Sequence, residues 1–202
     1  MPPLQLSLVL VSALFVVVIV AFSLYNGLIR SQKRVQEAWS GIDVHFRRRA
    51  SLVPNLVEVV KGYAAHEREV FQDVASARGA LQQASGAGQA ANANNMLSQA
   101  LARIFAVVEN YPQLRGSENF MSLRADLNDV EDKIAFARQF YNRNVLDYNT
   151  RIETYPTAFV ANLFSFASAE FFEADDEGRA EVRVSFAQPP ARSKEPAVPP
   201  AT

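Results

Sequence analysis

The first thirty residues constrain this chain more than any other segment. No charged side chain occurs from Pro2 to Ile29, and the strongly apolar part runs from Leu4 to Leu24. As an α-helix this part is roughly 31 Å long at 1.5 Å per residue, which matches the hydrocarbon core of a bilayer. A core helix of a soluble domain would need a polar face, which this segment lacks. The sequence therefore predicts a retained, single-pass transmembrane helix at about residues 4–24.

A cleaved signal peptide is the alternative interpretation of the same segment. Signal peptides have a basic start and a shorter apolar stretch. This chain has no Lys or Arg before the apolar run, although Ala21-Phe22-Ser23 resembles a small-x-small cleavage site. We expect retention of the helix.

The first charges after the apolar run are cationic: Arg30, Lys33 and Arg34. These residues flank the membrane anchor. The positive-inside rule then places the bulk of the chain in the cytoplasm and the short N-terminus outside, at the cell membrane. The alternative is an extracytoplasmic bulk.

Composition excludes several classes of protein. The chain has 202 residues, of which 49% are hydrophobic and 20% charged, with a formal net charge of −1. This is a globular composition, and the bulk charge does not favour nucleic-acid binding. Because there is no cysteine, disulfides, thiolate nucleophiles and cysteine zinc sites are excluded.

Helical periodicity dominates from Trp39 to about Ile152. Apolar residues recur at spacings of three and four through Trp39, Ile42, Phe46, Ala50, Val53, Val57, Val60 and Ala64, and continue less strictly through Phe71, Val74 and Leu81. Pro54 lies inside this stripe, yet the stripe keeps its phase. We therefore predict one helix kinked at Pro54 rather than a hairpin, which is the alternative.

Two further helices follow the turn at Ser85–Gly88. The first is expected at about residues 90–110, ended by Tyr111-Pro112, and the second opens with Ser117 as its N-cap. Its stripe runs through Leu123, Leu127, Val130, Ile134, Ala137, Tyr141, Val145, Tyr148 and Ile152. We expect Tyr141 and Tyr148 to point inward.

The predicted fold is all-α, with an N-terminal transmembrane helix followed by a bundle of three to four long antiparallel helices. Residues 1–29 hold the anchor, and residues 30–157 form the bundle domain. Residues 158–187 are an aromatic-rich segment expected to cap one end, with a short extended stretch at 181–186. The Pro- and Ala-rich tail, 188–202, is expected to be disordered.

Patterns for catalysis, metal or cofactors are not found. His45 and His66 would lie roughly 31 Å apart on one helix, so they cannot share a metal. Gly86-Ala87-Gly88 lacks the strand and lysine of a phosphate loop. Arg47–Arg49 would lie about 37 Å past Leu24, beyond a screening length of about 8 Å, and are interpreted as a solvated helix face. We predict no catalytic, cofactor-binding or metal-binding residue.

The candidate site is a set of polar residues at helical spacing beside the stripes. These are Asn55, Glu58, Glu131, Arg138, Asn142 and Asn149. One interpretation is an inter-helix network that fixes register, a known use of buried polar groups. The other is a partner or ligand groove on an open side of the bundle.

Several segments together resemble the LemA family. They are Tyr25-Asn26, EAWSGIDVHFRRRASLVPNLVEVVKGYAAHE (37–67), VVENYPQLRGSENF (107–120), IAFARQFYN (134–142) and YNTRIETYP (148–156). The resemblance implies a membrane-tethered bundle of long antiparallel helices. It implies little chemistry, because no enzymatic activity is established for the family as a whole.

Two hypotheses of function follow. The first is a non-enzymatic, membrane-anchored scaffold or adaptor that presents its bundle to partner proteins, with homo-oligomerisation through the aromatic segment as one form. The second is a binding module whose Tyr- and Asn-lined groove holds a small or lipid-like ligand. Neither involves a cofactor or nucleic acid.

Retention of the anchor is testable by mass. Because residues 4–24 are long enough to span and lack a basic start, protein extracted from membranes should keep its N-terminal segment. Intact-mass spectrometry measures this directly. A mature chain that starts near Leu24 would identify a cleaved signal peptide instead.

Overall fold

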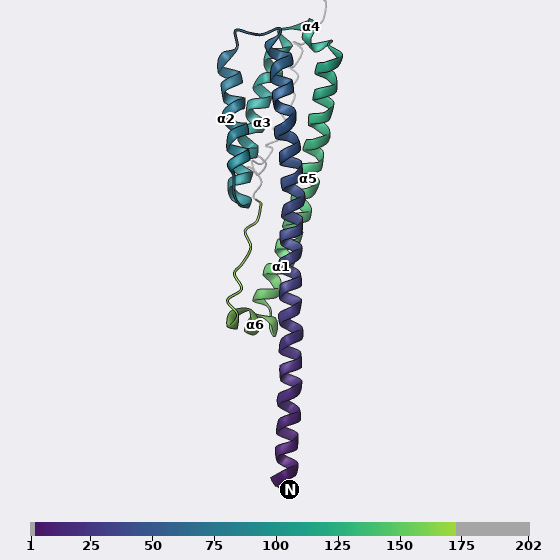
Figure 1. Ribbon diagram of the computed structural model, residues 1–202, viewed down its shortest axis with the longest axis vertical. Helices are drawn as coiled ribbons and strands as arrows, with labels where there is room; N and C mark the ends of the chain where they lie inside the picture. The colour runs from purple at the N-terminus through teal and green to yellow at the C-terminus, as the bar shows by residue number, and fades with distance from the viewer. Residues whose placement is uncertain (1–2, 173–202) are drawn as a thin grey trace, which may run out of the picture.

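The computed structural model describes residues 3–172, and these residues are helical with no strand among them (Figure 1). The helices are α1 (Pro3–Lys61), α2 (Arg68–Gln83), α3 (Ala87–Glu109), α4 (Pro112–Arg115), α5 (Glu118–Glu153) and α6 (Thr157–Leu163). The predicted all-α class and the bundle of long antiparallel helices are confirmed.

Helix α1 combines the membrane anchor and the bundle in one element. It has 59 residues, which corresponds to about 88 Å at 1.5 Å per residue. Its most apolar 18-residue window has a mean hydropathy of 2.9, and none of that window is buried. By length and composition, this part can cross a membrane. Figure 1 shows it projecting alone below the rest of the molecule.

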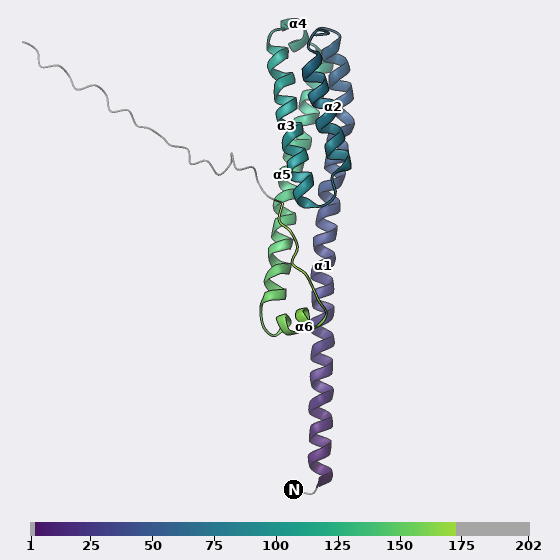
Figure 2. The same cartoon turned by 90° about the vertical axis from the view of Figure 1, so that its left-hand side faces the viewer.

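The bundle forms around the other half of α1. Helix α5 packs along α1, and the antiparallel pair α2–α3 covers the end of the bundle farthest from the N-terminus (Figures 1 and 2). The predicted stripes form the core: Ile42, Val60, Val74, Val130 and Ile134 are each fully buried, and Leu97 and Ile104 of α3 join them. Burial of such side chains contributes about 1.5–3 kcal/mol each, which is what holds these long helices side by side.

One turn was not predicted. The apolar stripe that continues less strictly through Phe71, Val74 and Leu81 belongs to a separate helix, α2, because the chain reverses at residues 62–67. Helix α2 buries its stripe in the same core, so its spacing of threes and fours matches that of α1. The reversal therefore leaves little trace in the apolar pattern.

Helix α1 continues through Pro54, as predicted, and the hairpin alternative is wrong. Figures 1 and 2 show one rod without a sharp bend, so the expected visible kink is not seen. Proline has no N–H to donate to the carbonyl of Ala50. Arg78 of α2 replaces it, because its Nε donates to that carbonyl at 2.9 Å. The carbonyl that Pro54 leaves without a donor in α1 is thus bonded by a side chain of α2.

Ser117 occupies the N-cap position of α5, as predicted, although its side chain makes no capping hydrogen bond. Beyond α5, the aromatic-rich segment forms α6 and then residues 164–172, which we call the return segment. The return segment runs back along α1 and α5, away from α6 (Figure 2). The expected stretch at 181–186 and the tail at 188–202 lie outside the described residues.

The bond between Arg78 and Ala50 gives a stability prediction. Replacing Arg78 with Ala leaves a part-buried carbonyl without its donor and should lower the free energy of unfolding by about 1–2 kcal/mol. In a Pro54→Ala background the cost should be smaller, because residue 54 then supplies an N–H to the same carbonyl. Urea denaturation of the full chain in detergent, followed by circular dichroism, measures this double-mutant cycle.

The matched control is Arg103→Ala, which removes an exposed ion pair with Asp73. That variant should change stability little. An equal cost of Arg78→Ala in both backgrounds would contradict the role assigned to Pro54.

Candidate functional site

Two asparagines of α5 hold the return segment by its main chain. Asn142 donates through Nδ2 to the Phe172 carbonyl at 2.9 Å and accepts from the Phe172 N–H at 2.8 Å. Asn149 makes the same pair of bonds with Ala169, both at 2.9 Å. The two residues lie seven positions apart, two helical turns, so their amides face the same way. These bonds involve only the main chain of the return segment and none of its side chains.

Two tyrosines complete this row of bonds. Tyr141 donates its hydroxyl to the Glu170 carbonyl, and Tyr148 donates to the Ala167 carbonyl, each at 2.8 Å. Both residues are buried, as their place on the stripe predicted. The Tyr141 ring also packs edge-on against Trp39 of α1. The return segment is therefore fixed to α5 at four successive points.

Burial raises the pKa of both phenols, and the Glu170 carboxylate adds to the rise at Tyr141. Ionisation would remove the proton that each tyrosine donates. Their contribution to stability is therefore complete below about pH 10 and declines as the pH rises through the raised folded-state pKa.

Phe172 anchors the end of the return segment. Its ring is 2% exposed and packs near Phe46 of α1, with centroids 6.1 Å apart. The Arg138 guanidinium lies over the same ring at 4.5 Å, a cation–π contact. The segment also passes close to the α2–α3 turn, because a Cβ added at Gly88 would lie 2.6 Å from a Glu170 carboxylate oxygen. This close approach requires a glycine or movement of the Glu170 side chain.

A second polar cluster surrounds Arg49. Its guanidinium donates to Asn94 at 2.6 Å and Ser98 at 3.0 Å, both on α3, and pairs with Glu131 of α5 at 2.9 Å. Burial lowers the pKa of Arg49, and the Glu131 charge opposes this change. The cluster joins three helices and fixes their register, since a buried charge is costly unless it is paired.

Arg49 corrects one interpretation of the sequence. Arg47–Arg49 were expected to form a solvated helix face, but the Arg49 side chain is only 6% exposed, because it turns toward α3 and α5. Arg47 and Arg48 are exposed as expected, and they pair with Asp43 and Asp129.

The predicted polar residues thus separate into three groups. Arg138, Asn142 and Asn149 meet on the return segment, and Glu131 joins Arg49. Asn55 and Glu58 are exposed, and Glu58 pairs with Lys61 on the same helix at 3.3 Å. They are exposed because α1 turns Val53, Leu56 and Val60 toward the core.

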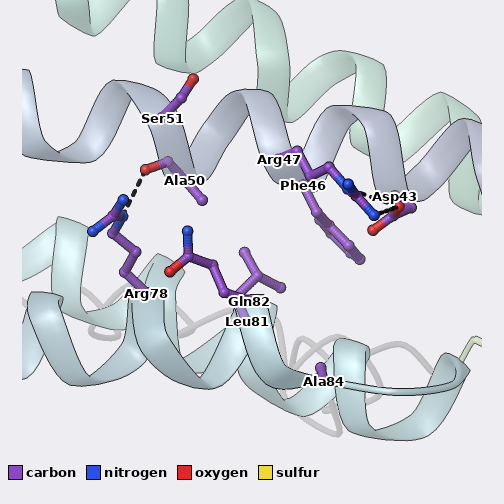
Figure 3. Close-up of a pocket in the computed structure, with 9 residues that line it drawn as sticks. All are labelled: Asp43, Phe46, Arg47, Ala50, Ser51, Arg78, Leu81, Gln82 and Ala84. Atoms are coloured by element: carbon purple, nitrogen blue, oxygen red, sulfur yellow. Dashed lines mark hydrogen bonds and ion pairs between the residues drawn. The ribbon is translucent and has the colours of Figure 1, made fainter.

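A concave feature with a volume of about 430 Å³ lies between α1 and α2 (Figure 3). Its lining residues are Asp43, Phe46, Arg47, Ala50, Ser51, Arg78, Leu81, Gln82 and Ala84. Arg47 pairs with Asp43, Arg78 serves the Ala50 carbonyl, and the Ser51 hydroxyl bonds its own helix. Arg47, Arg78 and Ser51 are therefore already engaged in bonds within the protein.

Within residues 3–172 no group of three or more His, Asp or Glu side chains could hold a metal ion. The hydrogen bond from Lys133 lowers the pKa of Asp129 on α5, and the charges of Arg48 and His45 act in the same direction. His66 lies in the reversal after α1, so the two histidines stay apart.

The fold defines a membrane-associated protein in which a bundle of long helices is built on an apolar N-terminal helix. The chain matches the LemA family over residues 38–186 and belongs to that family. It is 28% identical over 200 residues to magnetosome protein MamQ 2 of Paramagnetospirillum magneticum, covering 85% of this chain and 74% of that protein. It is 27% identical to magnetosome protein MamQ of Magnetospirillum gryphiswaldense (76% and 66% covered) and 23% to protein LemA of Metamycoplasma hominis (79% and 74%).

The asparagine contacts predict how firmly the return segment is held. Asn149→Ala removes two hydrogen bonds to Ala169, so amide exchange across residues 166–172 should accelerate by about 10- to 100-fold, as expected for a loss of 1–3 kcal/mol. Hydrogen-exchange mass spectrometry of the full chain measures this.

Asn144→Ala is the matched control, because Asn144 lies on the same helix but bonds only the Phe140 carbonyl of α5. If exchange in the return segment is the same for both variants, the amide pairs do not hold it.

Proposed function

We propose that this protein is a non-enzymatic, membrane-anchored scaffold whose bundle presents a surface to partner proteins. The observation that carries the proposal is the continuity of α1, which runs without a break from the exposed apolar segment into the core. One helix is thus both anchor and bundle member. A bundle held this way keeps a defined distance from the bilayer, which suits a platform for other proteins.

The outer face of α5 offers a surface for such a partner. Phe136, Phe140 and Leu146 are exposed by 73%, 52% and 57%. They lie on the side of α5 that points away from Ile134, Tyr141 and Val145, which enter the core. Phe136 and Phe140 lie one helical turn apart, and large apolar residues at this spacing form a surface on which an amphipathic partner helix can dock.

Membrane orientation forms part of the proposal. Arg30, Lys33 and Arg34 follow the apolar segment on α1, and Arg30 and Lys33 make their hydrogen bonds within that helix. Their charge supports placement of the bundle on the cytoplasmic side.

The second hypothesis, a groove for a small or lipid-like ligand, is less well supported. Tyr141, Asn142, Tyr148 and Asn149 all lie on α5, and all four bond the main chain of the return segment. A ligand would first have to displace that segment.

Site-specific photocrosslinking tests the scaffold proposal. Phe136 and Phe140 are replaced one at a time by benzoylphenylalanine, which keeps an aromatic ring, in the full chain expressed in membranes. We expect discrete adducts of the same mass at both positions, identified by mass spectrometry.

Met96 is a suitable control because it is 51% exposed but lies on α3. The α5 adducts should be absent there. Equal labelling at all three positions, or no adduct at either α5 position, would contradict a partner face on α5.

A further inference from the structure

A long uncharged stretch surrounds α6. No charged side chain occurs from Thr154 to Ala169, between Glu153 and Glu170. Another uncharged stretch, at residues 79–102, contains no aromatic side chain, whereas the stretch around α6 contains four: Tyr155, Phe159, Phe164 and Phe166. Such a stretch on a water-exposed end of a domain has to be explained by what covers it.

One side of α6 is packed against the bundle. Ala158, Val160 and Ala161 are buried, and Val160 and Ala161 form a small cluster with Leu28 of α1, which is 1% exposed. The position of α6 is therefore fixed relative to α1.

The opposite side of α6 is open and apolar. Tyr155, Phe159, Leu163 and Phe164 are exposed by 80%, 69%, 67% and 55%. We call these four residues the α6 outer face. Four large apolar side chains gathered within ten positions differ from the scattered exposed residues of ordinary surfaces, and a contiguous patch of this kind marks a contact site.

The α6 outer face lies at the level where α1 leaves its apolar segment. The ring of Phe164 stacks on Tyr25 with centroids 4.8 Å apart, and Phe166 contacts the same tyrosine at 5.8 Å. Tyr25 follows directly after Leu24, and the first charge of α1 comes only at Arg30. Figures 1 and 2 agree that α6 lies at the end of the bundle from which the N-terminal part of α1 projects.

We propose that α6 is a second membrane contact, whose outer face inserts into the lipid interface beside the anchor. Aromatic side chains favour the boundary between headgroups and acyl chains, and an uncharged segment there pays no cost of burying charge. The surface is continuous with the anchor, so a lipid surface is the occupant that the fold brings to it. The bundle then rests on the bilayer at two points, α1 and α6, rather than pivoting on α1 alone.

The absence of native cysteine makes a direct test simple. Single variants Phe159→Cys and Leu163→Cys of the full chain carry a nitroxide label and are reconstituted into phosphatidylcholine–phosphatidylglycerol vesicles. Collision with oxygen, which partitions into lipid, is compared with collision with a water-soluble nickel chelate. We expect both labels to collide more with oxygen and several-fold less with nickel than a label at Phe136→Cys, which lies on α5 and is 73% exposed.

A label at Val17→Cys shows whether the anchor itself is in lipid, so failure of α6 and failure of the anchor are distinguishable. If the labels at 159 and 163 behave like the label at 136, the proposal is overturned. Shielding from both collision partners, with spin–spin broadening that disappears on dilution with unlabelled protein, would show contact with a second copy and overturns it as well.

A second variant separates the contact from folding. Phe159→Ser, combined with the label at Leu163, should lose the lipid signature, while Phe136→Ser should leave it unchanged. The circular dichroism of both variants in detergent should stay the same, because neither residue is buried. An unchanged lipid signature in Phe159→Ser would show that Phe159 makes no contact with the bilayer.

Discussion

The packing of α5 along α1 is the contact on which the rest of the structure depends. The two halves of helix α1 have different surfaces. The N-terminal half is apolar on all sides, whereas the C-terminal half has one apolar face, formed by Ile42, Leu56, Val60 and their neighbours, that packs into the core. Only the second half has a face that can hold α5, α2 and α3. The change from an all-round apolar surface to a stripe therefore decides where lipid ends and the protein core begins.

Polar contacts add what apolar burial cannot, because hydrophobic contacts have no direction. Arg49 specifies the register of α1 against α3 and α5 through bonds to Asn94, Ser98 and Glu131. The bonds to the return segment do the same for a stretch of chain with no regular structure. An extended segment forms no hydrogen bonds within itself. Where it packs against a bundle, its N–H and C=O groups therefore need partners on the helices.

Much of the bundle could be predicted from the sequence, because helical stripes depend on local spacing alone. The burial of Tyr141 and Tyr148 could be predicted because both residues lie on such a stripe. The reversal at residues 62–67 was missed because α2 repeats the spacing of α1. The burial of Arg49 was missed because its partners on α3 are more than forty positions away in the sequence. Asn142 was recognised as a site residue, but its partner is a main chain, which has no side-chain signal.

The direction of the return segment sets the height along α1 at which Phe172 lies. The segment starts beside Tyr25 and ends beside Phe46, so it climbs by 21 residues of α1, or roughly 31 Å. A domain fused after Phe172 would therefore begin its tether well above the headgroups rather than at the bilayer. The volume that such a fused domain can reach would be centred on the middle of the bundle. A short flexible linker would bring the domain to the α2–α3 hairpin before it brings it to the membrane.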